Sequence, residues 1–344
     1  MRILILSALI LITLNLKSQT IQVSDLDSAI ATADRLIETN PKIFFRNVES
    51  LIASYDGQTR FEKYYNGIHG DSLHHIQSQT KSIVSLLMGI AIDKGFVKSA
   101  DELVSSYFPG YFSPAGSIKS ELRIKDLLTM SAGFEWEEMI PLDDPENDNI
   151  NMFNSGDYLK YILSKPVSDS LYGRFRYNSG CPMIIAGIIE KTAKMRLDRF
   201  AEKYLFNPLG ITDYGWIKDS TGFCHAGGGL YLKPVDIVKI GHLVMNHGTW
   251  NNQQIISEKW ISKVVHPYIA TNFGNSEYGY FWWINEYPLS QGRTVTVVSA
   301  EGAGGQKLYI FPEYQLIIAF TERNYTTPQV SPLFIMESIL PLLN

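Results

Sequence analysis

The 344-residue sequence has only two cysteines, Cys181 and Cys224, and 19% of its residues are charged. Two cysteines exclude a fold held together by several disulfides, and a chain of this length needs none because it can bury a large core. They leave open one disulfide or two separate buried thiols. The formal net charge of −5 lacks the basic excess that nucleic acids and anionic membranes attract, which argues against both as partners.

Motifs that hold metal ions or phosphate groups are also missing. There is no Cys-x-x-Cys, no His-Glu-x-x-His, no EF-hand loop and no phosphate-binding glycine loop. The adjacent pair His74-His75 lacks the spacing of metal ligands and is interpreted as an exposed or capping pair. The acidic stretch 143–148 is expected to be a solvated surface loop rather than a calcium site. The sequence therefore predicts neither a metal nor a cofactor.

A long apolar run occurs at the start of the chain. Met1 and Arg2 precede the almost entirely apolar residues 3–14, and the small residue Ser18 follows them. This pattern is typical of a cleaved signal peptide over residues 1–18, because the run is too short to span a bilayer comfortably; an uncleaved anchor is the alternative. Its removal would leave a net charge of about −7 and no stable membrane span. We therefore expect a secreted or periplasmic protein, whose oligomeric state the sequence leaves unknown.

Apolar periodicity predicts strands near both ends of the chain and helices between them. The segments 50–55 and 60–65 flank Asp56-Gly57, which is a hairpin signal. Further strands are expected at 278–284, 294–298, 307–311 and 316–321, and all of them should join one antiparallel sheet. Helical patterns occupy 25–38, 82–92, 124–130, 157–163, 183–190, 197–205, 235–245 and 331–343. We therefore predict an α/β (α+β) fold, with 24–99 and 235–344 in one discontinuous domain and a mostly helical domain, 100–234, inserted between them.

The most informative residues are Ser78 and Lys81, three apart where the apolar helix 82–92 begins. On a helix they would lie on one face, one turn apart. A serine hydroxyl becomes a useful nucleophile when a neighbouring amine, its pKa lowered by burial, removes its proton. The N-terminus of the helix would favour the alkoxide and the oxyanion that follows it. Because Ser-x-x-Lys also occurs by chance, its structural context must decide.

Two further clusters supply that context. Tyr177 precedes the helical pattern 183–190, where its hydroxyl could face a cleft and a nearby ammonium would favour the phenolate; a packed tyrosine is the alternative. The segment 300–306 is rich in glycine and lies between two predicted strands. Such a segment permits close approach of a ligand, as in an edge strand that holds an acyl substrate, although a tight turn would need the same glycines.

In their order along the chain, Ser-x-x-Lys at 78–81, Tyr177 before a helix and the glycine-rich edge strand resemble the serine β-lactamase-like hydrolases. The similarity is greatest to the branch that contains class C β-lactamases, penicillin-binding proteins and esterases. Supporting stretches extend it over most of the chain, at 127–136, 206–211 and 227–232. The resemblance implies a β-lactamase-like fold, an antiparallel sheet flanked by helices.

The resemblance also implies roles for individual residues. Ser78 would form the acyl-enzyme, Lys81 would be its proton partner, and Tyr177 would relay the proton to the leaving group. The backbone N–H groups of Ser78 and Ala303 would form the oxyanion hole. Which of Lys81 and Tyr177 removes the first proton stays open. The candidate substrate-binding residues are Ser179, Ala300, Gly302 and Trp136.

Two positions depart from the family pattern. The second motif of the family often ends in asparagine, whereas Ser179 holds that place here, and the third motif usually begins with lysine or histidine, where this chain has Ala300. A missing cation removes a charge-assisted partner for a substrate carboxylate. We therefore predict an exported serine hydrolase that acts on an ester or a small amide.

Two alternatives stay open at this point. One is D,D-peptidase, penicillin-binding or β-lactamase activity on cell-wall peptides or β-lactams. The other is a catalytically silent binding protein of the same fold, for which Ala300 is the best indication. An α/β-hydrolase is excluded, because no Gly-x-Ser-x-Gly follows a predicted strand.

Overall fold

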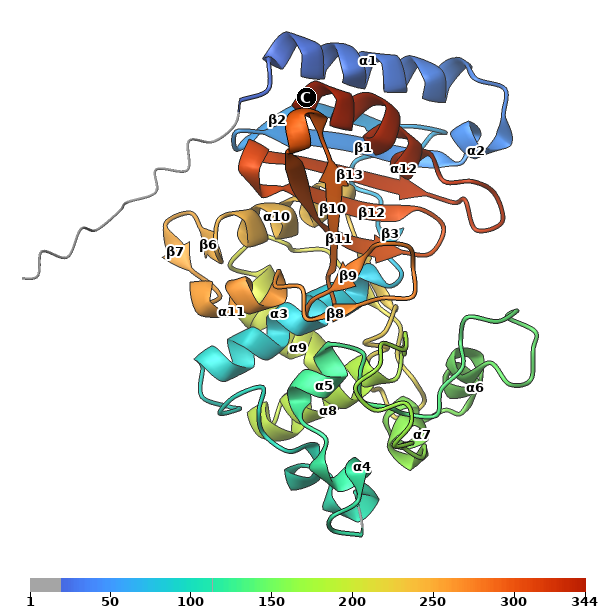
Figure 1. The fold of residues 1–344 in the computed structure, drawn as a ribbon, viewed down its shortest axis with the longest axis vertical. Coiled ribbons are helices and arrows are strands. Elements are labelled where there is room, and N and C mark those ends of the chain that lie inside the picture. The colour runs from blue at the N-terminus through green and yellow to red at the C-terminus, as the bar shows by residue number, and fades with distance from the viewer. Residues whose placement is uncertain (1–19, 113) are drawn as a thin grey trace, which may run out of the picture.

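The computed structural model describes residues 20–112 and 114–344. The predicted signal peptide, residues 1–18, lies outside the described residues. Within the described ranges, no helix combines the length and the apolar character needed to cross a bilayer. The chain forms a broad sheet with helices on both faces and a mostly helical part below it (Figure 1).

One antiparallel sheet of eight strands has the order β2-β1-β13-β12-β11-β10-β9-β8. Its strands are β1 (Val48–Tyr55), β2 (Gln58–Tyr64), β8 (Ile269–Ala270), β9 (Glu277–Tyr278), β10 (Trp283–Pro288), β11 (Thr294–Gly302), β12 (Gln306–Phe311) and β13 (Leu316–Glu322). The predicted hairpin is confirmed, with Asp56 and Gly57 both at positive φ as a tight turn requires. Pairing of β1 with β13 confirms that the two ends of the chain share one sheet.

The predicted strand 278–284 is wrong in one respect, because two strands occupy this region. Between β9 and β10 the backbone turns at Phe281, whose φ is 62°. The Phe281 carbonyl accepts a hydrogen bond from Ser82 Oγ at 2.7 Å, and its N–H donates to Leu128 O at 3.0 Å. Contacts with distant parts of the chain thus interrupt a segment whose composition favours a continuous strand.

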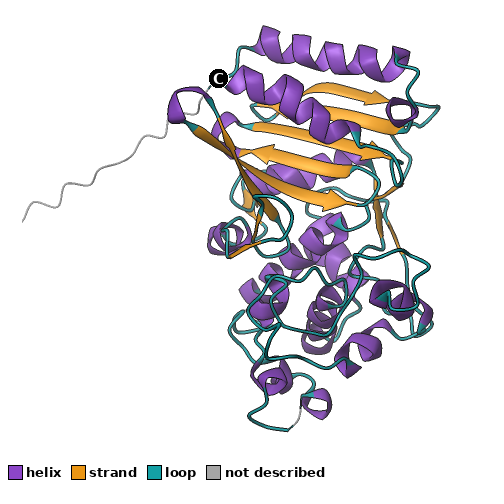
Figure 2. Ribbon diagram, turned by 45° about the vertical axis from the view of Figure 1, so that its right-hand side comes forward, coloured by secondary structure: helices purple, strands orange, loops and turns teal. Residues whose placement is uncertain are grey.

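Helices cover both faces of the sheet, as Figure 2 shows. One face packs against α1 (Val23–Thr39) and the C-terminal segment, in which α12 (Val330–Phe334) continues through Ile335–Ile339 and Leu340–Leu343 despite two prolines. The other face packs against α3 (Gln79–Asp93) and α10 (Pro234–Met245). Strand β1 shows the alternation that this arrangement requires. Leu51 packs in the core on the side of α1 and the C-terminal segment, and Ile52 packs in the core on the side of α3 and α10.

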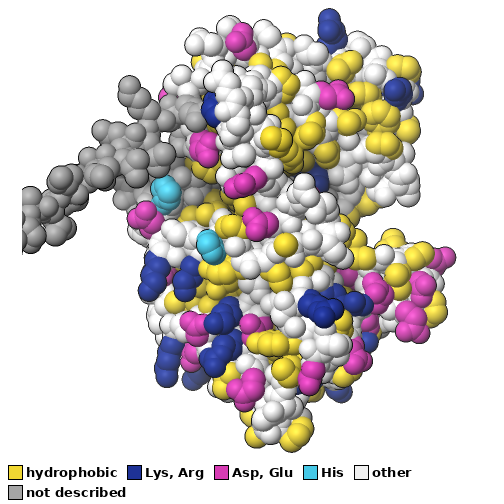
Figure 3. Space-filling model, in the orientation of Figure 1, with side chains coloured by type: hydrophobic (Ala, Val, Ile, Leu, Met, Phe, Trp, Pro, Cys, Tyr) yellow, Lys and Arg dark blue, Asp and Glu magenta, His cyan; other side chains and the backbone are white. Residues whose placement is uncertain are grey.

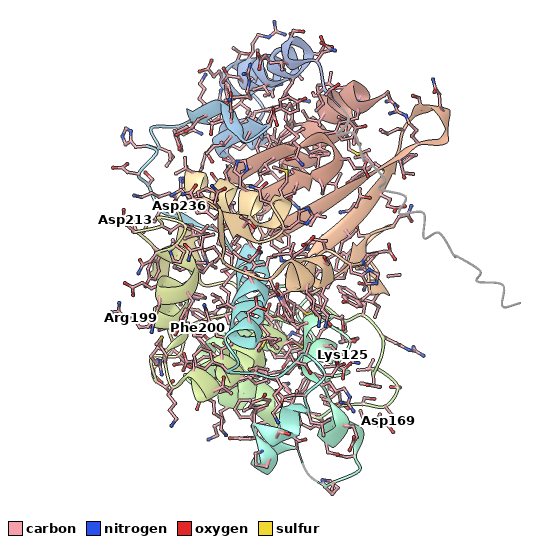
Figure 4. All side chains as sticks on the ribbon, turned by 90° about the vertical axis from the view of Figure 1, so that its left-hand side faces the viewer. Lys125, Asp169, Arg199, Phe200, Asp213 and Asp236 are labelled. Carbon is pink, nitrogen blue, oxygen red and sulfur yellow. The ribbon has the colours of Figure 1, made fainter. Side chains whose placement is uncertain are left out.

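The helical part surrounds α3 and α8 (Cys181–Ala193), which pack against each other. Its other helices are α4 (Ile118–Glu121), α5 (Ile124–Leu128), α6 (Asp148–Asn154), α7 (Tyr158–Ser164) and α9 (Leu197–Ala201). Helix α9 is amphipathic, because Phe200 is fully buried while Arg199 reaches solvent (Figure 4). The minor elements are α2 (Ile43–Arg46), α11 (Glu258–Val264), β3 (His74–His75), β4 (Gly215–Trp216), β5 (Leu230–Leu232), β6 (Thr249–Trp250) and β7 (Gln253–Gln254).

The cysteines and the histidine pair can be compared with their predicted surroundings. Cys181 and Cys224 are both buried free thiols, so the alternative without a disulfide is correct. The interpretation of His74-His75 as an exposed or capping pair is wrong, because the two residues form β3 and pair with β5, with His74 buried beside Glu49. Strand pairing places alternate residues on opposite faces, which sequence adjacency could not reveal.

The acidic stretch 143–148 lies on the projecting lobe near α6, where acidic side chains gather in Figure 3. Asp143 and Glu146 are exposed there, as expected for a solvated loop. Asp148 is buried instead, and it accepts hydrogen bonds from the Tyr161 hydroxyl and the Glu137 N–H. In the part of the chain that the structure describes, no group of three acidic, histidine or cysteine side chains could hold a metal ion.

Candidate active site

Ser78 lies at the N-terminus of α3, next to the lysine of its motif. Lys81 Nζ donates a hydrogen bond to Ser78 Oγ at 2.8 Å and another to Gly227 O at 2.5 Å. Ser78 is partly exposed, whereas Lys81 is only 1% exposed. Residues 79–91 of α3 are all buried, which holds the helix firmly in the core. The serine therefore faces solvent while its amine partner is shielded from it.

Tyr177 joins this pair from the segment that leads into α8. Lys81 Nζ lies 4.8 Å from the centroid of its ring. Burial raises the pKa of its hydroxyl, and the Ser78 side chain acts in the opposite direction. The turn that presents it is fixed by Asn178, whose side-chain oxygen accepts hydrogen bonds from the N–H groups of Gly180 and Cys181. This is a helix N-terminus stabilised by a side chain, the usual function of asparagine there. The structure thus brings the hydroxyl, the amine and the phenol together.

Burial separates the protonation states of the two candidate bases. It lowers the pKa of Lys81 to about 8, although the Glu138 carboxylate acts in the opposite direction. It raises the pKa of Tyr177 above its ordinary value, and the Glu138 carboxylate raises it further. A lysine with a pKa near 8 carries a useful fraction of neutral amine near neutral pH. A tyrosine with a raised pKa holds its proton there and is suited to donating it.

The end of β11 lies against the segment that leads to Ser78. A Cβ atom at Gly302 would lie 2.5 Å from Ile76 O and 2.9 Å from Gln77 Cβ, so only glycine fits without a shift of the backbone. Neither the Ser78 N–H nor the Ala303 N–H has an acceptor among the described residues. Two unpaired N–H groups on either side of this contact are what an oxyanion hole requires.

The other predicted site residues lie around this centre. Ser179 is buried and donates two hydrogen bonds to Glu138, from its N–H at 2.7 Å and from its hydroxyl at 2.9 Å. Trp136 is also buried, and its indole N–H donates to Glu138 at 2.7 Å. Ala300 lines a cavity of about 10 Å³ beneath α3, together with Gln79 and Ser82. Their roles in substrate binding stay predictions.

Sequence reasoning missed Glu138 and a hydrogen-bonded network beside Ser78. Gln77 has φ of 52°, and its side-chain amide donates to the hydroxyl of Tyr325 at 3.1 Å. It also contacts His75 Nδ1 at 2.9 Å, while His75 Nε2 contacts Gly228 O at 2.5 Å. A strained residue next to a nucleophile is typical of functional sites. The residue types alone gave no signal, because Tyr325, Gly228 and Ser179, which complete these contacts, lie far from them in the sequence.

Aromatic side chains line the other side of Tyr177. Its ring stacks on Trp283 with centroids 6.0 Å apart, and Phe175 and Phe273 make edge contacts with the same tryptophan. All four side chains are partly exposed, and Tyr278 is buried beneath them. A partly exposed aromatic wall offers apolar contact area to a ligand that approaches the hydroxyl of Tyr177.

Comparisons with known proteins agree with this geometry. The model of the family described as Beta-lactamase matches residues 48–332. The chain is 22% identical over 308 residues to the 6-aminohexanoate-dimer hydrolase of Paenarthrobacter ureafaciens, covering 84% of this chain and 76% of that protein.

Solved structures share the fold at low sequence identity. EstCE1, described as a hydrolase with promiscuous acyltransferase activity, superposes with a TM-score of 0.72 at 14% identity, over 92% of this chain and 99% of that one. A class C beta lactamase from Rhodobacter sphaeroides gives a TM-score of 0.67 at 15% identity, over 92% and 99%. At such identities the likeness shows the fold alone.

Proposed function

We propose that this chain, which belongs to the beta-lactamase family and is a serine hydrolase, forms an acyl-enzyme on Ser78. Its substrate would be an ester or a small amide. The observation that carries the proposal is the 2.8 Å hydrogen bond from the buried Lys81 Nζ to Ser78 Oγ. It is the contact that proton transfer from the hydroxyl to the amine requires.

The proposed reaction has two halves. In the first, Ser78 Oγ attacks the substrate carbonyl and its proton passes to Lys81, while the oxyanion is held by the N–H groups of Ser78 and Ala303. Tyr177 donates its proton to the departing alcohol or amine and recovers one from Lys81. In the second half, water attacks the carbonyl of the acyl-enzyme. The bond between the acyl carbon and Ser78 Oγ breaks, the proton of the water passes through the same groups to Ser78 Oγ, and the acid leaves. The lowered pKa of Lys81 and the raised pKa of Tyr177 support Lys81 as the first base.

Two observations support a substrate that has an apolar portion and does not depend on a cation at position 300. Ala300 places a buried methyl group where the family usually has a cation, so a substrate carboxylate would lack that partner. The aromatic wall of Phe175, Phe273 and Trp283 beside Tyr177 offers apolar contact instead. One relative is named a 6-aminohexanoate-dimer hydrolase, and this name supports small amides as well as esters as substrates.

We further propose that the protein is exported, on the strength of the apolar N-terminal run over residues 3–14 and the small residue Ser18 that follows it. A serine hydrolase of this kind needs no metal and no cofactor for the steps above. Export would place the enzyme outside the cytoplasm, in contact with esters and amides that come from outside the cell.

The proposal is tested by replacing the nucleophile. The Ser78→Ala variant is expected to lose hydrolysis of p-nitrophenyl butyrate and labelling by a fluorophosphonate, whereas the wild-type protein should gain one probe adduct, on Ser78, detected by intact mass. Rapid and stable labelling by a fluorescent penicillin would favour the D,D-peptidase alternative instead. Wild-type protein that reacts with no ester, amide, lactam or probe would favour the silent binding protein.

A further inference from the structure

Glu138 is held beside the proposed catalytic groups by three hydrogen bonds. Its Oε2 accepts from the indole N–H of Trp136 at 2.7 Å and from the Ser179 N–H at 2.7 Å, and its Oε1 accepts from the Ser179 hydroxyl at 2.9 Å. Ser179 follows Tyr177 by two residues. The carboxylate therefore fixes both the backbone and the side chain of the segment that presents the phenol.

A chain of contacts through Ser179 and Gly227 connects the same carboxylate to Lys81. A Cβ atom at Gly227 would lie 2.7 Å from Ser179 O, so these two residues are in direct contact. Gly227 O in turn accepts the second hydrogen bond of Lys81 Nζ. The Glu138 charge raises the pKa of Lys81, against the larger effect of burial. Burial also raises the pKa of Glu138 above its ordinary value, while Lys81 and the hydrogen bonds from Ser179 and Trp136 act in the opposite direction.

Other titratable side chains face Lys81, and each is neutral near neutral pH. Burial raises the pKa of Tyr177 and that of Cys181, and it lowers the pKa of His225 to about 3. Glu301 acts on Tyr177 from β11, but it is paired with Lys307. Within residues 20–112 and 114–344, Glu138 is thus the one negative charge that faces the Lys81 ammonium.

We propose that Glu138 is a positioning residue of this site, whose carboxylate anchors the Tyr177–Ser179 segment and serves as the counter-charge of the buried Lys81 ammonium. This inference rests on the proposed function, because it assigns Lys81 and Tyr177 to proton transfer. The inference adds to the site an acidic residue that lies outside the Ser-x-x-Lys and Tyr-x-x motifs.

The counter-charge predicts a direction for the pH dependence of catalysis. A nearby negative charge raises the pKa of an amine and of a phenol alike, because it favours the protonated form of both. Removing it should lower both pKa values. The pH at which kcat/KM reaches half its plateau on the acid side should therefore fall, whichever of Lys81 and Tyr177 is the first base.

The experiment compares Glu138→Gln with Glu137→Gln, using hydrolysis of p-nitrophenyl butyrate across the pH range in which Lys81 titrates. The glutamine at 138 keeps the size of the side chain and can still accept hydrogen bonds. Glu137 is the matched control, because the identical change removes one negative charge from the same segment. Glu137 pairs with Arg176 and takes no part in the hydrogen bonds from Trp136 and Ser179. We expect the acid limb to move down by about one pH unit in Glu138→Gln and to stay in place in Glu137→Gln.

Three outcomes would overturn the inference. One is a folded Glu138→Gln protein with an unmoved acid limb; another is an equal shift in Glu137→Gln, which would reflect net charge alone. The third concerns Glu138→Asp, which keeps the charge and should therefore retain the wild-type acid limb with a lower plateau. A shift of its acid limb as large as the one expected for Glu138→Gln would overturn the inference. The last test holds even if Glu138→Gln fails to fold. Failure of the proposed function would instead appear as hydrolysis that persists in Ser78→Ala.

Discussion

Replacing Gly302 with alanine should impair catalysis far more than folding. The added Cβ would lie 2.5 Å from Ile76 O and 2.9 Å from Gln77 Cβ, both too close for real contacts, and it would be tight against Gln306 Cβ at 3.0 Å. The end of β11 must therefore move away from the segment that leads to Ser78. Overpacking of this kind costs about 1–3 kcal/mol of the free energy of unfolding. A displaced Ala303 N–H would remove one oxyanion donor, which lowers kcat by about 10²–10³-fold.

The assay measures kcat for p-nitrophenyl butyrate together with urea unfolding of the same preparations. Gly110→Ala is the matched control, because a Cβ atom there meets nothing within 4 Å, and its kcat and stability should stay at wild-type values. A folded Gly302→Ala protein with wild-type kcat would refute the reasoning, since the contact between β11 and the Ile76–Gln77 backbone would then have no part in holding the oxyanion.

Two further predictions follow, one from the structure and one from the sequence. Gly89→Ala should lower the free energy of unfolding by about 1–3 kcal/mol in urea titrations, because its Cβ would lie 2.1 Å from the ring of Trp260, where α11 packs against α3; an unchanged midpoint would contradict that packing. Expression of the full sequence in a bacterium with a periplasm should yield a periplasmic protein whose intact mass lacks residues 1–18, and a cytoplasmic protein of full mass would contradict export.

The sheet could be predicted from the sequence because its strands carry their own signals. The hairpin turn at Asp56-Gly57 and the apolar segments after residue 290 each specify a strand locally, and buried strands need partners. The break between β9 and β10 could not be predicted, because it depends on Ser82 and Leu128, which bind the backbone of Phe281 from other parts of the chain.

The candidate site divides in the same way. Ser78 and Lys81 could be paired from the sequence because helical geometry fixes the relation between residues three apart. Tyr177 required a resemblance to a family, since nothing local relates it to α3. Glu138 gave no signal, because it follows Glu135 and Glu137 in a segment that resembles an ordinary acidic surface. Its partial burial, which strengthens the effect of its charge on Lys81, is a property of the folded chain alone.

The opposing effects on Lys81 explain why such a carboxylate is useful. Burial alone would lower the pKa of the amine further, and a buried ammonium without a counter-charge is costly. A weaker base would be neutral more often but would hold the proton of Ser78 less strongly. With Glu138 opposing the burial, the pKa stays at about 8, so that at pH 7 about one amine in ten is neutral and ready to accept a proton. The ammonium formed during acylation is then stabilised at the moment when the oxyanion develops.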